Sequence, residues 1–286
     1  MTASGYGVAE RQPLRAVLFV NPKSGGGKAT RVSLAERARE RGIDAIVLRP
    51  DDDLATLVDQ AVARGADALG VAGGDGSLAV VAAAALGHDL PFVCVPAGTR
   101  NHFALDVGVD RGDLVGSLEA FTDGVERRID VGEVNGRLFL NNVSLGVYGD
   151  AVRQPTYRDA KARTLLETAA HVLGPSGAVV DLQLVDDRGQ SHRNPAVVLV
   201  SNNPYSFEPP RSPGTRPRLD SGQLGILVLD SVATGQRPGK TWTATSYEVT
   251  SPAPLHAGVD GEAVDLTPPL RFVIRPRALR VRLPRP

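Results

Sequence analysis

Sulfur, net charge and long apolar runs are all scarce in this chain of 286 residues. Its single cysteine, Cys94, cannot form an internal disulfide and stands in an apolar run, where it is expected to pack as a small core residue. Lysine plus arginine and aspartate plus glutamate both total 32, so no net field attracts nucleic acid or an anionic membrane. There is no run of 18 apolar residues, and Met1 to Pro13 hold no apolar signal-peptide core. We therefore expect a soluble, cytoplasmic protein.

Patterns typical of metal centres and nucleic-acid interfaces are also missing. The histidines are not spaced as metal ligands, and the basic side chains are not interleaved with aromatic ones. We therefore expect His88, His171, His192 and His256 to be surface or packing residues, and we expect no nucleic-acid partner.

The first half of the chain alternates short apolar runs with segments of helical character. Buried strands are predicted at Ala16–Val20, Ala45–Leu48, Ala68–Ala72 and Phe92–Val95. Helices are predicted from Lys28 to about Arg41, from Leu54 to Arg64 behind an N-cap in Asp51–Asp53, and after Ser77. Strands that alternate with helices indicate an α/β domain, a doubly wound parallel sheet covered on both faces.

Near Val125 the pattern changes to short strands and turns. Asn135-Gly136 stands between alternating segments and predicts a hairpin. A single helix is predicted at Asp159–Leu173, and further strands at Val179–Val185, Ala196–Val200, Leu224–Leu229, Thr241–Thr250 and Leu270–Ile274. We therefore predict two domains. Residues 1–128 form a nucleotide-binding α/β domain, and residues 129–286 form an antiparallel β-sandwich, with a tail of about 275–286 that completes the sandwich or packs back on the first domain.

Three glycine-rich polar loops follow strands of the predicted parallel sheet: Asn21–Lys28, Gly73–Ser77 and Pro96–Ala104. The first is not a Walker A loop, because Pro22 and Ala29 stand where that pattern requires Gly and Ser or Thr. Each loop alone is equally compatible with an ordinary turn, and Asn101 with a helix cap. Because the carboxyl ends of parallel strands share one sheet edge, the three together predict a phosphate-binding site with Lys23 or Lys28 as a cation.

The aspartate within the second loop makes the predicted function of the phosphate-binding site more specific. A carboxylate at Asp75 repels phosphate unless a metal ion or a proton transfer accounts for it. The loop therefore indicates phosphoryl transfer more than simple nucleotide binding.

Two further acidic motifs stand far down the chain. Gly258-Val259-Asp260-Gly261-Glu262 is, on local signals, a hairpin turn of Asp-Gly type, although the fold could also bring its two carboxylates to the phosphate loops. Leu219-Asp220-Ser221-Gly222-Gln223-Leu224 is likewise compatible with an ordinary turn before a strand.

Taken in order, these motifs resemble the diacylglycerol kinase catalytic-domain family. That family includes bacterial soluble lipid kinases and sphingosine kinases and is more distantly related to NAD kinases. The matching segments span nearly the whole chain: Asn21–Gly25, Gly73–Ser77, Pro96–Asn101, Gly146-Val147-Tyr148-Gly149-Asp150, Leu219–Gly222 and Asp260–Glu262.

The resemblance implies ATP bound in a cleft between the two domains, Mg²⁺, and the hydroxyl of a lipid such as diacylglycerol as acceptor. It implies that Asp75 handles phosphate and metal, that Asp260 is the general base, and that Glu262 supports metal or base. Asp220, with the backbone carbonyls of Arg218 and Gln223, resembles a structural Mg²⁺ site. The ATP-binding residues implied are Asn21, Lys23, Ser24, Gly25, Gly73, Gly74, Asp75, Gly76, Ser77, Gly98, Thr99 and Asn101.

We expect the protein to bind a lipid substrate and to contact a membrane surface transiently. We also expect that it can form a homodimer. Two departures from the family pattern keep other readings open: Arg100 stands where the family often has Gly, and His102 where it often has Asp. One alternative is a kinase of a soluble hydroxyl compound, as NAD kinases are. The other is a nucleotide-binding regulator without catalytic activity.

Overall fold

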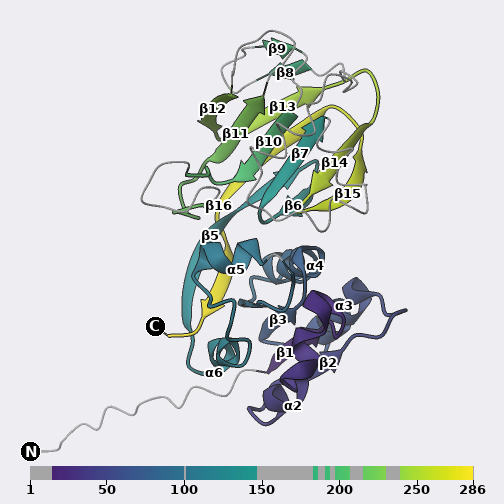
Figure 1. Ribbon diagram of the computed structural model, residues 1–286, viewed down its shortest axis with the longest axis vertical. Coiled ribbons are helices and arrows are strands. Elements are labelled where there is room, and N and C mark those ends of the chain that lie inside the picture. The colour runs from purple at the N-terminus through teal and green to yellow at the C-terminus, as the bar shows by residue number, and fades with distance from the viewer. Residues whose placement is uncertain are drawn as a thin grey trace, which may run out of the picture.

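A parallel sheet with helices on both faces forms the N-terminal domain of the computed structural model (Figure 1). The structure describes residues 15–99, 101–146, 183–185, 191–193, 197–206, 215–229 and 239–285. Four strands lie in the order β2-β1-β3-β4: β1 (Ala16–Val20), β2 (Asp44–Val47), β3 (Ala68–Ala72) and β4 (Phe92–Val95). Every residue of β1, β3 and β4 is buried, as expected for a parallel sheet covered on both sides. The predicted fold class is confirmed.

Two hydrophobic clusters cover the two faces of this sheet. One joins it to α3 (Leu54–Ala63), α4 (Asp75–Gly87) and α5 (His102–Val107). The other joins it to α1 (Lys28–Arg31), α2 (Leu34–Arg39), a 3₁₀ turn η2 (Gly116–Leu118) and α6 (Glu119–Thr122). The N-cap prediction for α3 is confirmed, since the Asp53 carboxylate accepts hydrogen bonds from the N–H groups of Ala55 and Thr56. The prediction of one helix from Lys28 to Arg41 is wrong: Ser33 takes a left-handed φ of 48° and separates α1 from α2.

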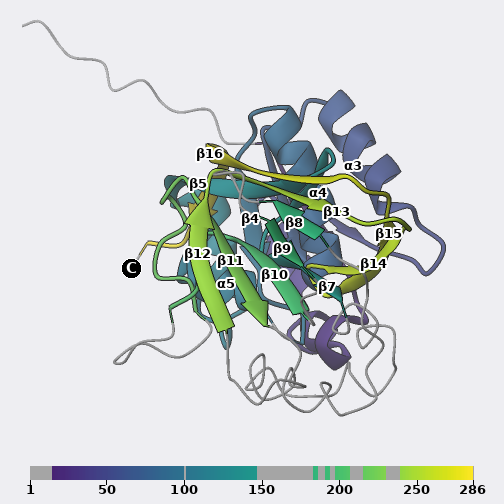
Figure 2. The ribbon, with the colours of Figure 1, turned by 90° about the horizontal axis from the view of Figure 1, so that it is seen from above.

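The second domain is a β-sandwich. One layer is antiparallel, in the order β12-β11-β10-β7-β14-β15, with bounds β7 (Asn142–Gly146), β10 (Val197–Asn202), β11 (Leu224–Leu229), β12 (Gly239–Ala244), β14 (Leu255–Val259) and β15 (Glu262–Leu266). The facing layer holds β5 (Val125–Val134), β6 (Arg137–Phe139), β8 (Gln183–Val185), β9 (Ser191–Arg193), β13 (Ser246–Thr250) and β16 (Leu270–Leu283). Figure 2 shows the layer of β10, β11 and β12 opposite β13 and β16. Aromatic rings such as Phe139 and Phe272 pack between them.

Strands β5 and β16 pass from one domain into the other (Figure 1). They pair antiparallel along most of their length, with an irregularity between Arg275 and Leu279. The first half of β16 pairs with β13 of the sandwich, whereas Val281 in its second half pairs in parallel with Phe92 of β4. Strand β16 as a whole therefore belongs to both domains, and the position between residues 128 and 129 lies within β5. A continuous sheet across the boundary holds the two domains in a defined relation.

The second half departs from prediction at one place. Residues Thr241–Thr250 form two strands, because the chain leaves β12 at Thr245 and enters β13 in the facing layer. The Asn135-Gly136 hairpin is confirmed, with φ of 47° and 83° as such a turn requires. The predicted helix at 159–173 and residues 147–150 of one motif lie outside the described residues. Within the described part of the chain, no helix combines the length and apolarity needed to cross a bilayer.

Candidate functional site

The three glycine-rich loops meet at the carboxyl edge of the parallel sheet. A Cβ added at Gly98 would lie only 2.9 Å from the carbonyl oxygen of Gly73 and from the Cα of Gly74. A Cβ at Gly25 would overlap the carbonyl of Ala97, and Gly25 also has a left-handed φ of 56°. Backbones this close leave no room for side chains, so glycine is required at each contact. The predicted convergence of the loops is thus present in the structure.

Side chains tie these loops together. Lys28 donates from Nζ to the carbonyl oxygen of Gly98 at 3.2 Å, which joins the first loop to the third. Asn21 accepts from the N–H of Lys23 at 3.0 Å and so holds its own turn. Ser24 lies in the short 3₁₀ turn η1 (Ser24–Gly26), whereas Lys23 is exposed. These contacts fix the backbone of the loop and leave the charge of Lys23 facing solvent.

Asn101 acts on the loop that precedes α5. It occupies the N-cap position of that helix with φ of 49°, but its side chain does not cap. Instead Nδ2 donates to the carbonyl oxygens of Pro96 at 2.9 Å and Gly98 at 2.8 Å. The residue is buried, while Thr99 is exposed. Asn101 therefore holds the backbone of the third loop in place through its hydrogen bonds. Thr99 is exposed, so its hydroxyl is open to a ligand from solvent.

Helix α4 begins within the second loop. Gly74 is its N-cap and offers no side-chain hydrogen bond, so the first backbone N–H groups of the helix have no capping side chain. Asp75 is its first residue, and the Glu262 carboxylate comes from β15 of the other domain to touch Gly76. A Cβ at Gly76 would overlap that carboxylate. The fold therefore brings Asp75 and Glu262, remote in sequence, to the same helix N-terminus.

Asp260 lies in the hairpin turn before Glu262, and the residue is buried, with 5% of its surface exposed. Oδ2 accepts from the N–H of Leu140 at 2.8 Å, and Oδ1 accepts from Asn141 at 2.7 Å and Asn142 at 3.0 Å. Burial raises the pKa of Asp260, although the three N–H groups and the nearby guanidinium of Arg216 act in the opposite direction. The carboxylate thus anchors the start of β7 and has a higher pKa than an ordinary aspartate.

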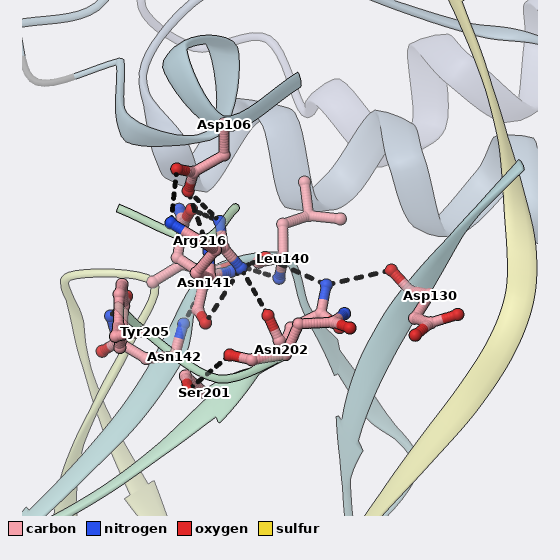
Figure 3. Close-up of polar contacts among 11 residues, drawn as sticks. Asp106, Asp130, Leu140, Asn141, Asn142, Ser201, Asn202, Tyr205 and Arg216 are labelled. Atoms are coloured by element: carbon pink, nitrogen blue, oxygen red, sulfur yellow. Dashed lines mark hydrogen bonds and ion pairs between the residues drawn. The ribbon is translucent and has the colours of Figure 1, made fainter. Parts of the chain in front are cut away.

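Arg216 is a central residue of the domain interface that the sequence patterns did not indicate (Figure 3). It is 2% exposed and pairs with Asp106 of α5 at 2.7 Å. Its other donors reach backbone and side-chain oxygens around the start of β7 and the end of β10. No local signal marked it, because Arg216 stands in a Pro- and Arg-rich stretch and its partner is 110 residues away.

The Asp220 loop, expected to hold a structural Mg²⁺ with the carbonyls of Arg218 and Gln223, has basic side chains beside its carboxylate. Oδ1 of Asp220 accepts from Nε of Arg218 at 3.1 Å, and the guanidinium of Arg277 lies 3.9 Å from Oδ2. Both guanidinium groups belong to exposed side chains, and the structural Mg²⁺ site at Asp220 stays a prediction. In the part of the chain that the structure describes, no group of three His, Cys, Asp or Glu side chains could hold a metal ion.

Comparisons with known proteins agree with this geometry. The family model described as "Diacylglycerol kinase catalytic domain" matches residues 15–134. The chain is 30% identical over 291 residues to the "Probable lipid kinase YegS-like" protein of Pseudomonas aeruginosa, covering 94% of each. It is 32% identical over 124 residues to the "Diacylglycerol kinase" of Bacillus subtilis, covering 42% of this chain and 40% of that one.

Solved structures have the same fold. A diacylglycerol kinase crystal structure from Bacillus anthracis superposes with a TM-score of 0.70 at 19% identity, covering 96% of this chain and 99% of that chain. The sequence similarity over 94% of the chain, the catalytic-domain match and the converging glycine-rich loops lead to one conclusion. The chain is a kinase that belongs to the diacylglycerol kinase catalytic-domain family of lipid kinases.

Proposed function

We propose that this protein transfers the γ-phosphoryl group of ATP to a hydroxyl of a lipid such as diacylglycerol. The observation that carries the proposal is the contact of Glu262 with Gly76, which brings a carboxylate of the sandwich to the helix N-terminus of the phosphate loops. A kinase needs acidic groups beside bound phosphates, and here one comes from each domain, Asp75 from the first and Glu262 from the second. Because diacylglycerol resides in a bilayer, the proposal includes transient contact with a membrane surface.

The loops and the start of α4 supply the phosphate site. Backbone N–H groups at a helix N-terminus bind phosphate oxygens, and four of the predicted ATP-binding residues, Gly74 to Ser77, form the N-terminus of α4. Asp75 and Glu262 would hold Mg²⁺, which is commonly bound by one or two carboxylates together with substrate phosphates and offsets the charge on the transferring group. Asp75 precedes Gly76 in α4, and the Glu262 carboxylate lies against Gly76, so the two acidic residues share one helix N-terminus.

Asp260 is proposed as the general base. It would accept the proton of the acceptor hydroxyl as the hydroxyl oxygen bonds to the γ-phosphorus and the bond to ADP breaks. Two features support this role. Burial raises its pKa, which makes it a better proton acceptor than an ordinary aspartate, and its three N–H bonds use three of about four lone-pair sites of a carboxylate.

The test of the base is the pH dependence of turnover by Asp260→Asn. In the wild type, kcat/KM should fall as the pH drops through the raised pKa of Asp260, because the protonated carboxyl cannot take a proton. The asparagine variant should lose most activity, and its residual rate should no longer show that acidic limb. If the variant is slower but its rate still falls at acidic pH, Asp260 is not the base. Its role is then only to hold residues 140–142 through hydrogen bonds.

The acceptor is identified by incubating total lipid extract with labelled ATP and separating the products by thin-layer chromatography. A labelled lipid supports the proposal, and its mobility identifies the acceptor class. Label found only in a water-soluble compound would support a kinase of a soluble acceptor. Binding of ATP without any labelled lipid or water-soluble product would support a nucleotide-binding regulator without catalytic activity.

A further inference from the structure

Arg216 has a complete set of hydrogen-bond partners although it is buried. A guanidinium carries five N–H donors. Nε donates to Oδ2 of Asp106 at 2.8 Å, and Nη2 reaches the same oxygen at 2.7 Å and Oδ1 of Asn141 at 2.8 Å. Nη1 donates to the carbonyl oxygens of Leu140 at 2.6 Å and Asn202 at 2.8 Å. With every donor used, this arginine has none left for a phosphate of ATP or of a lipid.

The charge of Arg216 is stabilised by its neighbours. Burial disfavours the guanidinium charge and is the largest single influence, but Asp106, Tyr205 and Asp260 together outweigh it, so the pKa of Arg216 lies above its ordinary value. The other oxygen of Asp106 accepts from the backbone N–H of Arg216 at 3.0 Å, so the pair is held at both ends of the arginine. A buried pair of this kind is costly to break, because one partner is left charged and unpaired.

A series of contacts connects the third loop to Asp260, and Figure 3 shows its central part, from Asp106 through Arg216 to Leu140 and Asn141. Asn101 holds the third phosphate loop, and α5 follows it directly and carries Asp106. Arg216 then joins Asp106 to the carbonyl of Leu140 and to the side chain of Asn141. The N–H groups of those same two residues bind the carboxylate of Asp260.

We propose that Arg216 is a positioning residue: together with Asp106 it sets the place of Asp260 relative to the phosphate loops. It touches no reacting atom, and it acts through the peptide groups at 140–142. Its importance for turnover rests on the proposed kinase reaction, whereas the coupling between α5 and Asp260 is a property of the structure itself.

The coupling is tested by hydrogen exchange of the unliganded protein, comparing the wild type with Arg216→Lys. Lysine keeps a positive charge but has three donors in place of five. Amides at 140–142 and in α5 should exchange about tenfold faster, while β1 and β3 should not change. Arg271→Lys is the matched control, since that arginine is exposed and pairs with Glu248 far from the site. Unchanged exchange at 140–142, or equal acceleration in every segment, would overturn the proposal.

Turnover provides the second measurement. Because misplacement by about 1 Å costs on the order of 100-fold in rate, kcat of Arg216→Lys should fall by about that factor while the KM for ATP stays near the wild-type value. Asp106→Asn preserves side-chain size and should show the same split if the lysine variant folds poorly. An unchanged kcat in both variants would refute the positioning role. If the wild type phosphorylates no lipid, the proposed function fails, and the exchange measurement still decides the coupling.

Discussion

Adding one methyl group at Gly76 is expected to separate stability from activity. Gly76 is the second residue of α4, and its Cβ position is occupied by the Glu262 carboxylate. In Gly76→Ala the backbone needs no adjustment, because the φ of Gly76 is not left-handed. Glu262 must move instead, since it is the end of an exposed side chain on β15.

The size of each effect follows from this geometry. Alanine is favoured over glycine in a helix by about 0.5–1 kcal/mol, whereas removing a carboxylate from a helix N-terminus costs about 0.3–1 kcal/mol. The two nearly cancel, so the free energy of unfolding should change by less than about 1 kcal/mol. To regain ordinary contact, the carboxylate must withdraw by roughly 1.5–2 Å, and a displacement of about 1 Å already costs about 100-fold when it affects reacting groups.

The assay combines urea unfolding with kcat measured on the labelled lipid identified from the extract. Gly87→Ala is the matched control, because Gly87 lies at the other end of α4 with no atom within 4 Å of its Cβ position. Only Gly76→Ala should lose turnover, and both variants should unfold near the wild-type urea concentration. Full kcat in Gly76→Ala, or equal losses in both variants, would refute a functional contact between Glu262 and α4.

Three other predictions concern stability and reactivity. Gly70→Ala should lower the free energy of unfolding by about 1–3 kcal/mol in urea, because its Cβ would overlap the Phe121 ring in the core; wild-type stability would contradict this. The hydrogen bond from Arg280 lowers the pKa of Glu126, so the pair should stabilise the fold above pH 4.5 and lose its effect as the pH falls through the lowered pKa. Compared with Glu126→Gln, the wild type should be more stable by less than about 1 kcal/mol at pH 7 and equal at pH 2, and a gap that widens in acid would refute the assignment. Burial raises the pKa of Cys94, so a thiol reagent at pH 8 should label it only after unfolding, and rapid labelling of native protein would show that the strand is accessible.

Local patterns predicted the strands of the first domain and one hairpin of the second. Strands β1, β3 and β4 have the bounds that their apolar runs indicated, and Asp53 and the Asn135-Gly136 turn act as expected. These features depend on residues near one another in the chain, which is why composition and spacing suffice. The break at Ser33 and the crossing at Thr245 were missed. The crossing depends on which layer each strand joins, and no local pattern shows that.

The candidate site likewise combines features that the sequence predicted with contacts that only the fold creates. Glycine turns after buried strands were visible in the order of residues, since a turn that brings backbone close to phosphate requires glycine whatever surrounds it. The contact of Glu262 with α4, the three N–H partners of Asp260 and the pairing of Arg216 with Asp106 were not visible. These partners are more than a hundred residues apart, and only the packing of the sandwich against the parallel sheet brings them together. Burial at that interface then raises the pKa of Asp260 and leaves Arg216 without solvent, so their chemistry arises from tertiary contacts rather than from residue type.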